Sequence, residues 1–373
     1  MPNSPLPLTL KAVAAAIKQD GGQSTGRAVL FAAGVNLDLF EQHIPELAAA
    51  TGVGQARLHE IVKVARTALD DTSPRVPGQH VVSQVLLRQF TIPTNDGDRL
   101  LAHSLQFGKS KLRAPRGVGK LEHFVKIDSQ ETERLWGQTE QDLPAALAAA
   151  GTRRIFANPK HVAVIKDAIA LHFARSLELL QAHAMLWEHG LERTRQQYLA
   201  DEATMATLFY KRYGLLPPSA RAAGEIISAQ LLAETRQLYE SGAIFRLRVV
   251  DMFHAARQFA AKAGLEIIRP SRGEFLIGDV PAIPIDATRQ ALGVMGGVPF
   301  ADASTVILPL GPRRLAALGR TDTFRSVPGS FVKQLNAFQI MKAQTHLFMR
   351  PGSGLESFVL AQRPPTGPTL SHP

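Results

Sequence analysis

The sequence predicts an α+β protein: a mainly helical bundle with a small, mostly antiparallel sheet, preceded by a small all-α domain. Two observations predict this class. Apolar residues recur at helical spacing from about Ser129 to Gly264, and short apolar runs bounded by Gly and Pro follow from Leu265 to Met349. Helices and strands that occupy separate parts of a chain are typical of α+β proteins.

The first 72 residues are expected to form a helical, adaptor-like domain that binds a protein partner. Helical spacing is visible in four segments: 8–17, 25–34, 37–50 and 55–69. A linker is expected at residues 73–78, where the chain holds two prolines and one glycine and loses its periodicity.

The turn Gly52-Val53-Gly54, between the last two of these segments, resembles the hairpin of a helix-hairpin-helix element. In that element the glycines let backbone N–H groups approach a DNA phosphate closely. Glycine is also the usual residue at the end of a helix. Because only one copy is present and residues 1–74 are slightly acidic, a plain turn in an interaction module is the preferred interpretation.

An α+β domain is expected over residues 79–350, followed by a Pro-rich tail over 351–373. A β-hairpin with Gly108 in its turn is predicted near the start of this domain. Long helical stretches are predicted at 159–189, at 219–264 with an interruption at Ser241-Gly242, and at 332–344. Strands are predicted at 265–270, 273–279, 304–310, 313–318 and 346–349.

Positive charge is concentrated in two short segments of a chain whose formal net charge is +10. Residues 75–120 hold eight Lys/Arg and two Asp/Glu, and residues 311–350 hold seven and one. If the fold brings these segments together, they form a basic surface suited to phosphate or nucleic acid. The alternative is scattered, solvated side chains whose stems cover apolar surface.

Several functional classes find no support in the sequence. Without cysteine, the chain has no disulfide, no thiolate nucleophile and no Cys-type zinc site. It lacks the P-loop, the Rossmann glycine fingerprint, HExxH and GxSxG, which argues against an ATPase, a dehydrogenase and an α/β-hydrolase. Neither a signal peptide nor a membrane span is visible, so a cytoplasmic protein without a membrane partner is expected.

Six sequence blocks follow one another over the second domain: QHVVSQVLLRQF, VGKLEHFVKID with ETERLWGQTEQDL, ALHFARSLELL, EFLIGDVPAI, VILPLGPRRLAAL and LNAFQIMKAQ. In this order they make residues 79–350 resemble the bacterial domain-of-unknown-function family 4238. The chain departs from the family pattern at two positions, with Ser83 where Pro is usual and Val280 where Asn often follows the strand-ending Asp. The resemblance implies no reaction. Both departures lie close in sequence to expected site residues, Ser83 to His80 and Val280 to Asp279.

Three residues in these blocks are the candidate catalytic groups: His80, Asp279 and Arg175. The imidazole of His80 suits acid/base work near neutral pH, or it anchors the linker by a local hydrogen bond. Asp279 ends a predicted strand, where it can serve as a base or a metal ligand, or else cap the bend. A divalent cation, Mg²⁺ or Mn²⁺, would bind at Asp279 if the protein uses one.

Arg175 interrupts a strongly apolar helical stretch, and a buried arginine is usually paired. It is expected to contact a phosphate or to form an ion pair with Asp279, and His172 one turn earlier can share its helix face. The expected substrate- or phosphate-binding residues are Arg88, Arg313, Arg314 and Asn336. Asn336 could instead support an internal turn, and the arginines could be solvated.

The leading hypothesis is a phosphodiester- or nucleotide-directed hydrolase, an effector in bacterial conflict or defence. The basic segments and the set of His, Asp and Arg residues support it. A non-catalytic module that binds nucleic acid or a nucleotide signal is the alternative, in which the same residues hold a pocket. The third hypothesis is a protein-interaction or toxin-like component whose polar residues are structural.

Overall fold

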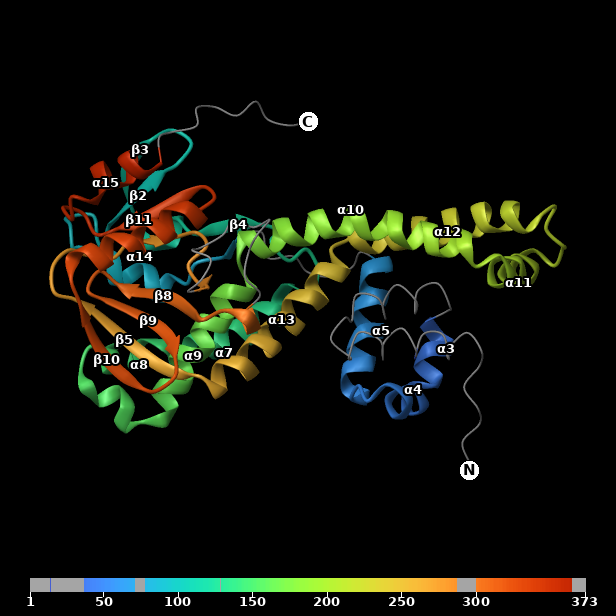
Figure 1. Cartoon of the computed structure of the whole chain (residues 1–373), viewed down its shortest axis with the longest axis horizontal. Coiled ribbons are helices and arrows are strands. Elements are labelled where there is room, and N and C mark those ends of the chain that lie inside the picture. The colour runs from blue at the N-terminus through green and yellow to red at the C-terminus, as the bar shows by residue number, and fades with distance from the viewer. Residues whose placement is uncertain (1–13, 15–36, 71–77, 128, 287–299, 364–373) are drawn as a thin grey trace. The chain divides into compact units, whose positions relative to one another are not determined.

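The computed structural model describes residues 14, 37–70, 78–127, 129–286 and 300–363 (Figure 1). The helices expected at 8–17 and 25–34 and most of the linker lie outside these residues, as does most of the Pro-rich tail. The chain divides into two compact units. The helical unit holds residues 1–76, 125–132 and 183–251, and the α+β unit holds residues 77–124, 133–182 and 252–373.

The helical unit contains the described N-terminal helices together with later parts of the chain. Its helices are α3 (Leu37–Gln42), α4 (Ile44–Thr51), α5 (Gln55–Asp70), α11 (Glu202–Tyr213), α12 (Ala220–Glu240), most of α10 (Leu177–Ala200) and the first half of α13 (Ala243–Lys262). Phe40, Leu47 and Ile61 of the N-terminal helices share a buried core with Leu238 and Leu247. The N-terminal helices therefore belong to a unit that also includes the middle of the chain.

The Gly52-Val53-Gly54 turn ends α4 and leads into α5. Gly52 caps α4 in the left-handed conformation at φ 77°, and its N–H donates to the carbonyl of Ala48. The carbonyl of Gly54 accepts hydrogen bonds from Arg57 and Leu58 in the first turn of α5. This geometry is that of an ordinary glycine-capped connection between two helices.

The α+β unit contains three sheets. Its strands are β1 (Gly78–His80), β2 (Leu100–Ser104), β3 (Lys109–Arg113), β4 (Lys120–Glu122), β5 (Gly264–Pro270), β6 (Ile277–Gly278), β7 (Ile283–Ile285), β8 (Thr305–Gly311), β9 (Arg314–Gly319), β10 (Thr323–Val327) and β11 (His346–Met349). The sheets have the orders β1-β4, β10-β5-β9-β8-β7 and β3-β2-β11-β6. Only the β5–β10 pair is parallel among the described strands, so the predicted α+β class with mostly antiparallel sheets is confirmed.

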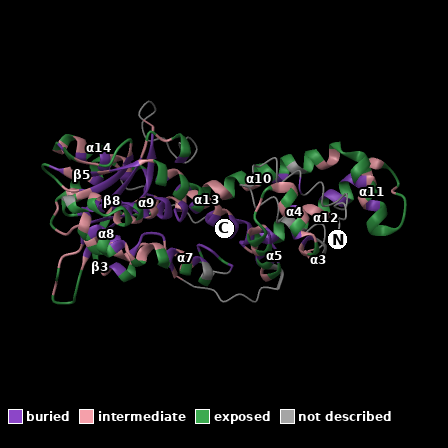
Figure 2. Ribbon diagram, turned by 90° about the horizontal axis from the view of Figure 1, so that it is seen from below, coloured by how far each residue is buried: buried purple, intermediate pink, exposed green. Residues whose placement is uncertain are grey.

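The helices of the α+β unit cover these sheets. They are α6 (Gln84–Leu87), the end of α7 (Ser129–Gln141), α8 (Leu143–Ala150), α9 (Pro159–Ala174), α14 (Gly329–Lys342) and α15 (Leu355–Gln362), with short 3₁₀ turns at Arg88–Phe90, Pro115–Gly117, Arg153–Ala157 and Phe300–Asp302. Helix α14 packs through Val332 and Leu335 on the five-stranded sheet and through Ile340 on the four-stranded sheet. Most residues of strands β5 and β8 are buried (Figure 2).

Three features differ from the sequence-based expectation. The single helix predicted for 159–189 is two helices, because the chain turns at Arg175 (φ −100°, ψ 45°) between α9 and α10. The Ser176 hydroxyl then accepts the N–H of Leu179, as a helix-starting serine does. Strands β4, β7 and β10 were not predicted, and α15 lies in the segment predicted as tail. The break at Ser241-Gly242 is confirmed, with Gly242 at φ 87°.

Candidate functional site: a basic cleft and a buried polar cluster

One face of the four-stranded sheet forms the floor of a cleft of about 1060 Å³ in the α+β unit. Side chains alternate between faces along a strand, and cross-strand partners share a face. Lys109 pairs with Ser104, and Ser104 pairs with His346. One step along, Lys111 pairs with Ala102. The opposite face carries apolar residues that pack against α14 and α15, so these helices fix which face is left open.

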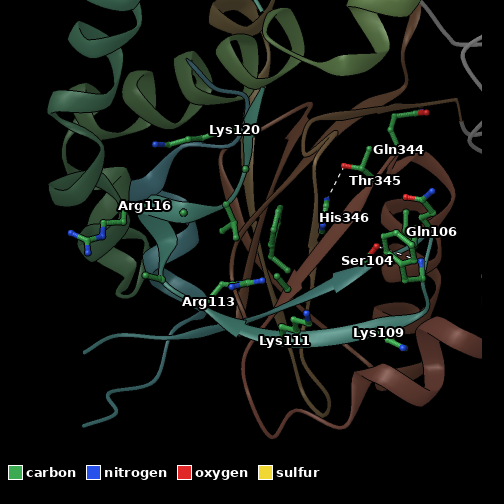
Figure 3. Close-up of a pocket in the computed structure, with 18 of the residues that line it drawn as sticks. Ser104, Gln106, Lys109, Lys111, Arg113, Arg116, Lys120, Gln344, Thr345 and His346 are labelled. Carbon is green, nitrogen blue, oxygen red and sulfur yellow. Dashed lines mark hydrogen bonds between the residues drawn. The ribbon is translucent and has the colours of Figure 1, made fainter. Parts of the chain in front are cut away.

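The cleft is lined by cations and by no carboxylate. Lys109, Lys111 and Arg113 follow one another on the same face of β3 (Figure 3). Alternate residues of a strand are about 6.8 Å apart. Arg116 and Lys120 come from the segment after β3. A sixth cation, Arg363, donates to the carbonyls of Ile340 and Ala343. None of the other five forms an ion pair with another residue of the described chain, and all five side chains are exposed. The cleft therefore carries uncompensated positive charge.

Asp279 positions the other wall of the cleft, the segment Gln344–His346. Its Oδ1 accepts the N–H of Gln344 at 2.7 Å, and its Oδ2 accepts the N–H of Thr345 at 2.7 Å and that of His346 at 3.0 Å. The hydroxyl of Thr345 also donates to Oδ2. With both oxygens bound to the chain and the side chain only 2% exposed, Asp279 is arranged as a positioning residue and not as a metal ligand.

His346 is the titratable aromatic group of the cleft. Its Nδ1 lies 3.0 Å from the hydroxyl of Thr345 (Figure 3). Its ring stacks on that of Phe348, with a centroid separation of 6.2 Å. Burial lowers the pKa of His346, although the nearby Asp279 acts in the opposite direction. Burial therefore favours the neutral form of this imidazole.

A second polar group is buried around Arg175. The guanidinium, 1% exposed, forms an ion pair with Glu140 of α7 and lies 5.4 Å from the ring centre of Trp136. Its Nη2 also lies 3.4 Å from Nε2 of His172. The predicted Arg175–Asp279 ion pair is wrong, because Glu140, seven residues after Glu133 on α7, supplies the carboxylate.

The protonation state of His172 follows from its hydrogen bonds. Its Nδ1 lies 2.7 Å from the carbonyl of Ala168 and donates to it, and its Nε2 accepts the N–H of Ser83 at 3.1 Å. Complete burial, with Arg175 nearby, lowers the pKa of His172 to about 3. Burial acts to raise the pKa of Glu140, but the charge of Arg175 lowers it, and a hydrogen bond from the hydroxyl of Ser83 acts in the same direction. Ser83 thus links the start of α6 to this cluster.

His80 reaches the same cluster from β1. Burial, and then the charges of Lys120 and Arg175, lower its pKa to about 4, and its ring bonds the carbonyl of Arg116. Burial raises the pKa of Glu133 on α7, even though Arg175 acts against this. Within the described chain, four buried atoms of this cluster have no hydrogen-bond partner: His80 Nε2, Glu133 Oε1, Trp136 Nε1 and Arg175 Nε. The structure therefore brings His80 and Arg175 together and holds Asp279 in different contacts.

The predicted phosphate-binding residues lie outside the basic cleft. Arg313 donates to the carbonyls of Gly273 and Pro270, and Arg314 donates to the carbonyl of Leu147. Both arginines line a smaller cavity of about 410 Å³. Arg88 is exposed in another cavity, which also contains Asp96 and Asp98.

Asn336 has a structural arrangement. It is buried, its Oδ1 accepts the N–H of Leu276, and its Nδ2 donates to the carbonyl of Glu274. Both halves of the amide are used inside the unit, so it is placed to join α14 to the chain before β6. Of the two sequence alternatives for Asn336, support of an internal turn fits these contacts.

The cations of β3 and the carboxylates of α7 were not predicted as site residues from the sequence. The segment KSKLR alternates basic and other residues with a period of two, which places its three cations on one face of a strand. Glu133 and Glu140 are two helical turns apart and therefore lie on one side of α7. Both patterns are visible in the sequence. However, the first does not indicate which sheet the strand joins, and the second does not indicate which arginine the carboxylates contact.

A family model described as "Protein of unknown function (DUF4238)" matches residues 78–353. No curated protein and no solved structure shows a match to the chain. Among the described helices, none is both long enough and apolar enough to cross a bilayer. The described residues also contain no group of three His, Asp or Glu side chains arranged to hold a metal ion.

Proposed function

The chain belongs to the DUF4238 family, and we propose that its α+β unit binds the phosphate groups of nucleic acids or nucleotides in the basic cleft. One observation carries the proposal: six Lys and Arg side chains line one cavity, and no carboxylate does. Such a cavity attracts anions over the range of the Debye length and retains those with several charges. Phosphates of nucleotides and nucleic acids have this charge density.

The arrangement of the cleft supports this choice over scattered surface charge. Three of the cations follow the edge strand β3, whose backbone position is fixed by β2. The facing segment Gln344–His346 is fixed by Asp279. A site with both walls held in place loses little conformational freedom when a ligand binds. The second basic segment, residues 311–350, contributes Gln344–His346 to the wall of the cleft. Arg313 and Arg314 of the same segment line the smaller cavity instead.

Phosphodiester hydrolysis is the second candidate function, and the buried cluster favours it. Hydrolysis needs one group that takes a proton from water and one that protonates the departing oxygen. The candidates for these two roles are His80, which is neutral at pH 7 and whose Nε2 has no partner within the described chain, and Glu133, whose pKa is raised by burial. His80 is paired in sequence register with Lys120, a lining residue of the cleft.

A panel of labelled ligands tests both functions. Full-length protein is incubated with single- and double-stranded DNA, RNA and nucleoside triphosphates, with Mg²⁺, Mn²⁺ or EDTA. We expect salt-sensitive binding of at least one ligand. Cleavage that His80→Ala and Glu133→Gln abolish, with binding retained, would establish the hydrolase. Binding without turnover would leave the binding function alone, and the absence of both signals would overturn the proposal.

A further inference from the structure

The two ends of the basic cleft differ in chemistry. Towards the β2–β3 turn the lining is aromatic and polar, with Gln106, Phe107 and His346. Along β3 and into the next segment the lining is cationic. A ligand that satisfies both ends carries flat rings as well as a row of phosphates. We propose, resting on the phosphate-binding function above, that the cleft takes a single-stranded nucleic acid, with a base on Phe107 and the phosphate backbone along Lys109, Lys111 and Arg113.

Phe107 has no packing role that explains its position. Its side chain is 59% exposed at the turn of the hairpin, although phenylalanine is usually buried. It belongs to none of the described hydrophobic cores of the α+β unit, whereas Leu105, two residues earlier, is 5% exposed and packs into one. An exposed ring at the end of a cationic row is the combination by which proteins bind unpaired bases.

His346 provides a second flat ring on the same side of the cleft. It pairs with Ser104, the last residue of β2 before the turn that carries Phe107. Its ring is nearly parallel to that of Phe348, at an interplanar angle of 6°. Stacking on such rings tolerates every base, since each has a π-face, but it requires a base free of its partner strand. Duplex DNA keeps its bases stacked inside and presents mainly phosphates.

The row on β3 is suited to a strand that runs along it. Because β3 is the edge of its sheet, its outer side is not covered by another strand of that sheet. The repeat of about 6.8 Å between alternate residues sets three cations in line. Sequence specificity is not expected, since stacking and phosphate contacts carry little base information.

Fluorescence anisotropy with full-length protein and a labelled oligonucleotide tests this inference. The same sequence is compared as single strand and as duplex, and inorganic tripolyphosphate serves as a competitor without bases. We expect the single strand to bind more tightly than the duplex. Phe107→Ala should weaken single-strand binding about tenfold and leave the inhibition constant of tripolyphosphate unchanged. Leu112→Ala, an exposed apolar residue (52%) on the opposite face of β3, is the matched control and should change neither.

The outcomes separate this inference from the phosphate-binding function. Tighter duplex binding, or equal single-strand affinity for wild type and Phe107→Ala, would overturn the single-strand inference while phosphate binding stands. If neither polyphosphate nor oligonucleotide binds in a way that depends on Lys109, Lys111 and Arg113, the phosphate-binding function itself fails.

Discussion

At the scale of single residues, two buried side chains set the shape of the α+β unit without facing the cleft. Asp279 gathers the N–H groups of three successive residues, and Arg175 joins Glu140 to His172. Hydrogen bonds to a charged group contribute about 1.5–3 kcal/mol each, more than neutral ones. The position of the cleft wall and that of α7 therefore depend on one carboxylate and one guanidinium.

Asp279→Ala should weaken nucleic-acid binding although Asp279 does not line the cleft. The change removes the acceptor for three backbone N–H groups, so the segment Gln344–His346 loses its fixed position. We expect a loss of about 3 kcal/mol in the free energy of unfolding, measured by urea denaturation, together with weaker binding. Asp302→Ala, an exposed carboxylate, serves as the control. Unchanged stability would contradict the positioning role.

His172 should make the protein less stable in mild acid. The pKa of His172 is about 3 in the folded protein and near 6.5 in the unfolded chain. Between these two values the unfolded chain binds a proton at this histidine and the folded protein does not. Stability should therefore fall as the pH drops below about 6.5, with His172 contributing a loss of about 2 kcal/mol at pH 5. Urea denaturation at pH 7.5 and pH 5 measures this loss, which His172→Gln should reduce and the exposed His189→Gln should not. An identical pH dependence in His172→Gln would show that this histidine is not buried in its neutral form.

At the scale of elements, the sequence indicated where helices and strands lie better than it indicated which residues contact one another. Helical spacing located α5, α9, α12, α13 and α14, and the short apolar runs located β5, β8, β9 and β11. The break at Arg175 was missed, because the apolar spacing of ALHFARSLELL continues through it while the guanidinium turns to Glu140. Arg313 and Arg314 were predicted to bind phosphate, but in the structure they donate to backbone carbonyls. No sequence pattern indicates such contacts, because the carbonyls belong to distant parts of the chain.

The segment between β3 and β4 should depend on one glycine. Gly119 has φ +66°, and a Cβ there would lie 3.0 Å from Leu87 and 3.2 Å from Val82. Its carbonyl also accepts the N–H groups of Val81 and Val82. Gly119→Ala should therefore cost about 1–2 kcal/mol of stability and displace the neighbouring Lys120. Thermal denaturation checks this against Gly117→Ala, where a Cβ meets nothing within 4 Å. Equal melting temperatures for the two variants would contradict the expectation.

At the scale of the whole molecule, positive charge gathers in a cavity of the α+β unit that the family model covers. The charge count located the first basic segment, residues 75–120, and the strand β3 in that segment supplies the row of cations. The count could not show that the second basic segment contributes mainly Gln344–His346, because contact between segments is a property of the folded sheet.

The salt dependence of nucleic-acid binding tests the role of the cleft most directly. For single strands, the slope of log K against log salt concentration is about −0.7 for each phosphate neutralised, so the five exposed cleft cations predict a slope of about −3.5. The triple variant Lys109→Ala, Lys111→Ala and Arg113→Ala should reduce it to about −1.4, while Lys333→Ala, an exposed lysine on α14, leaves it unchanged. A triple variant that binds with the wild-type affinity and slope would contradict the assignment of binding to this cleft.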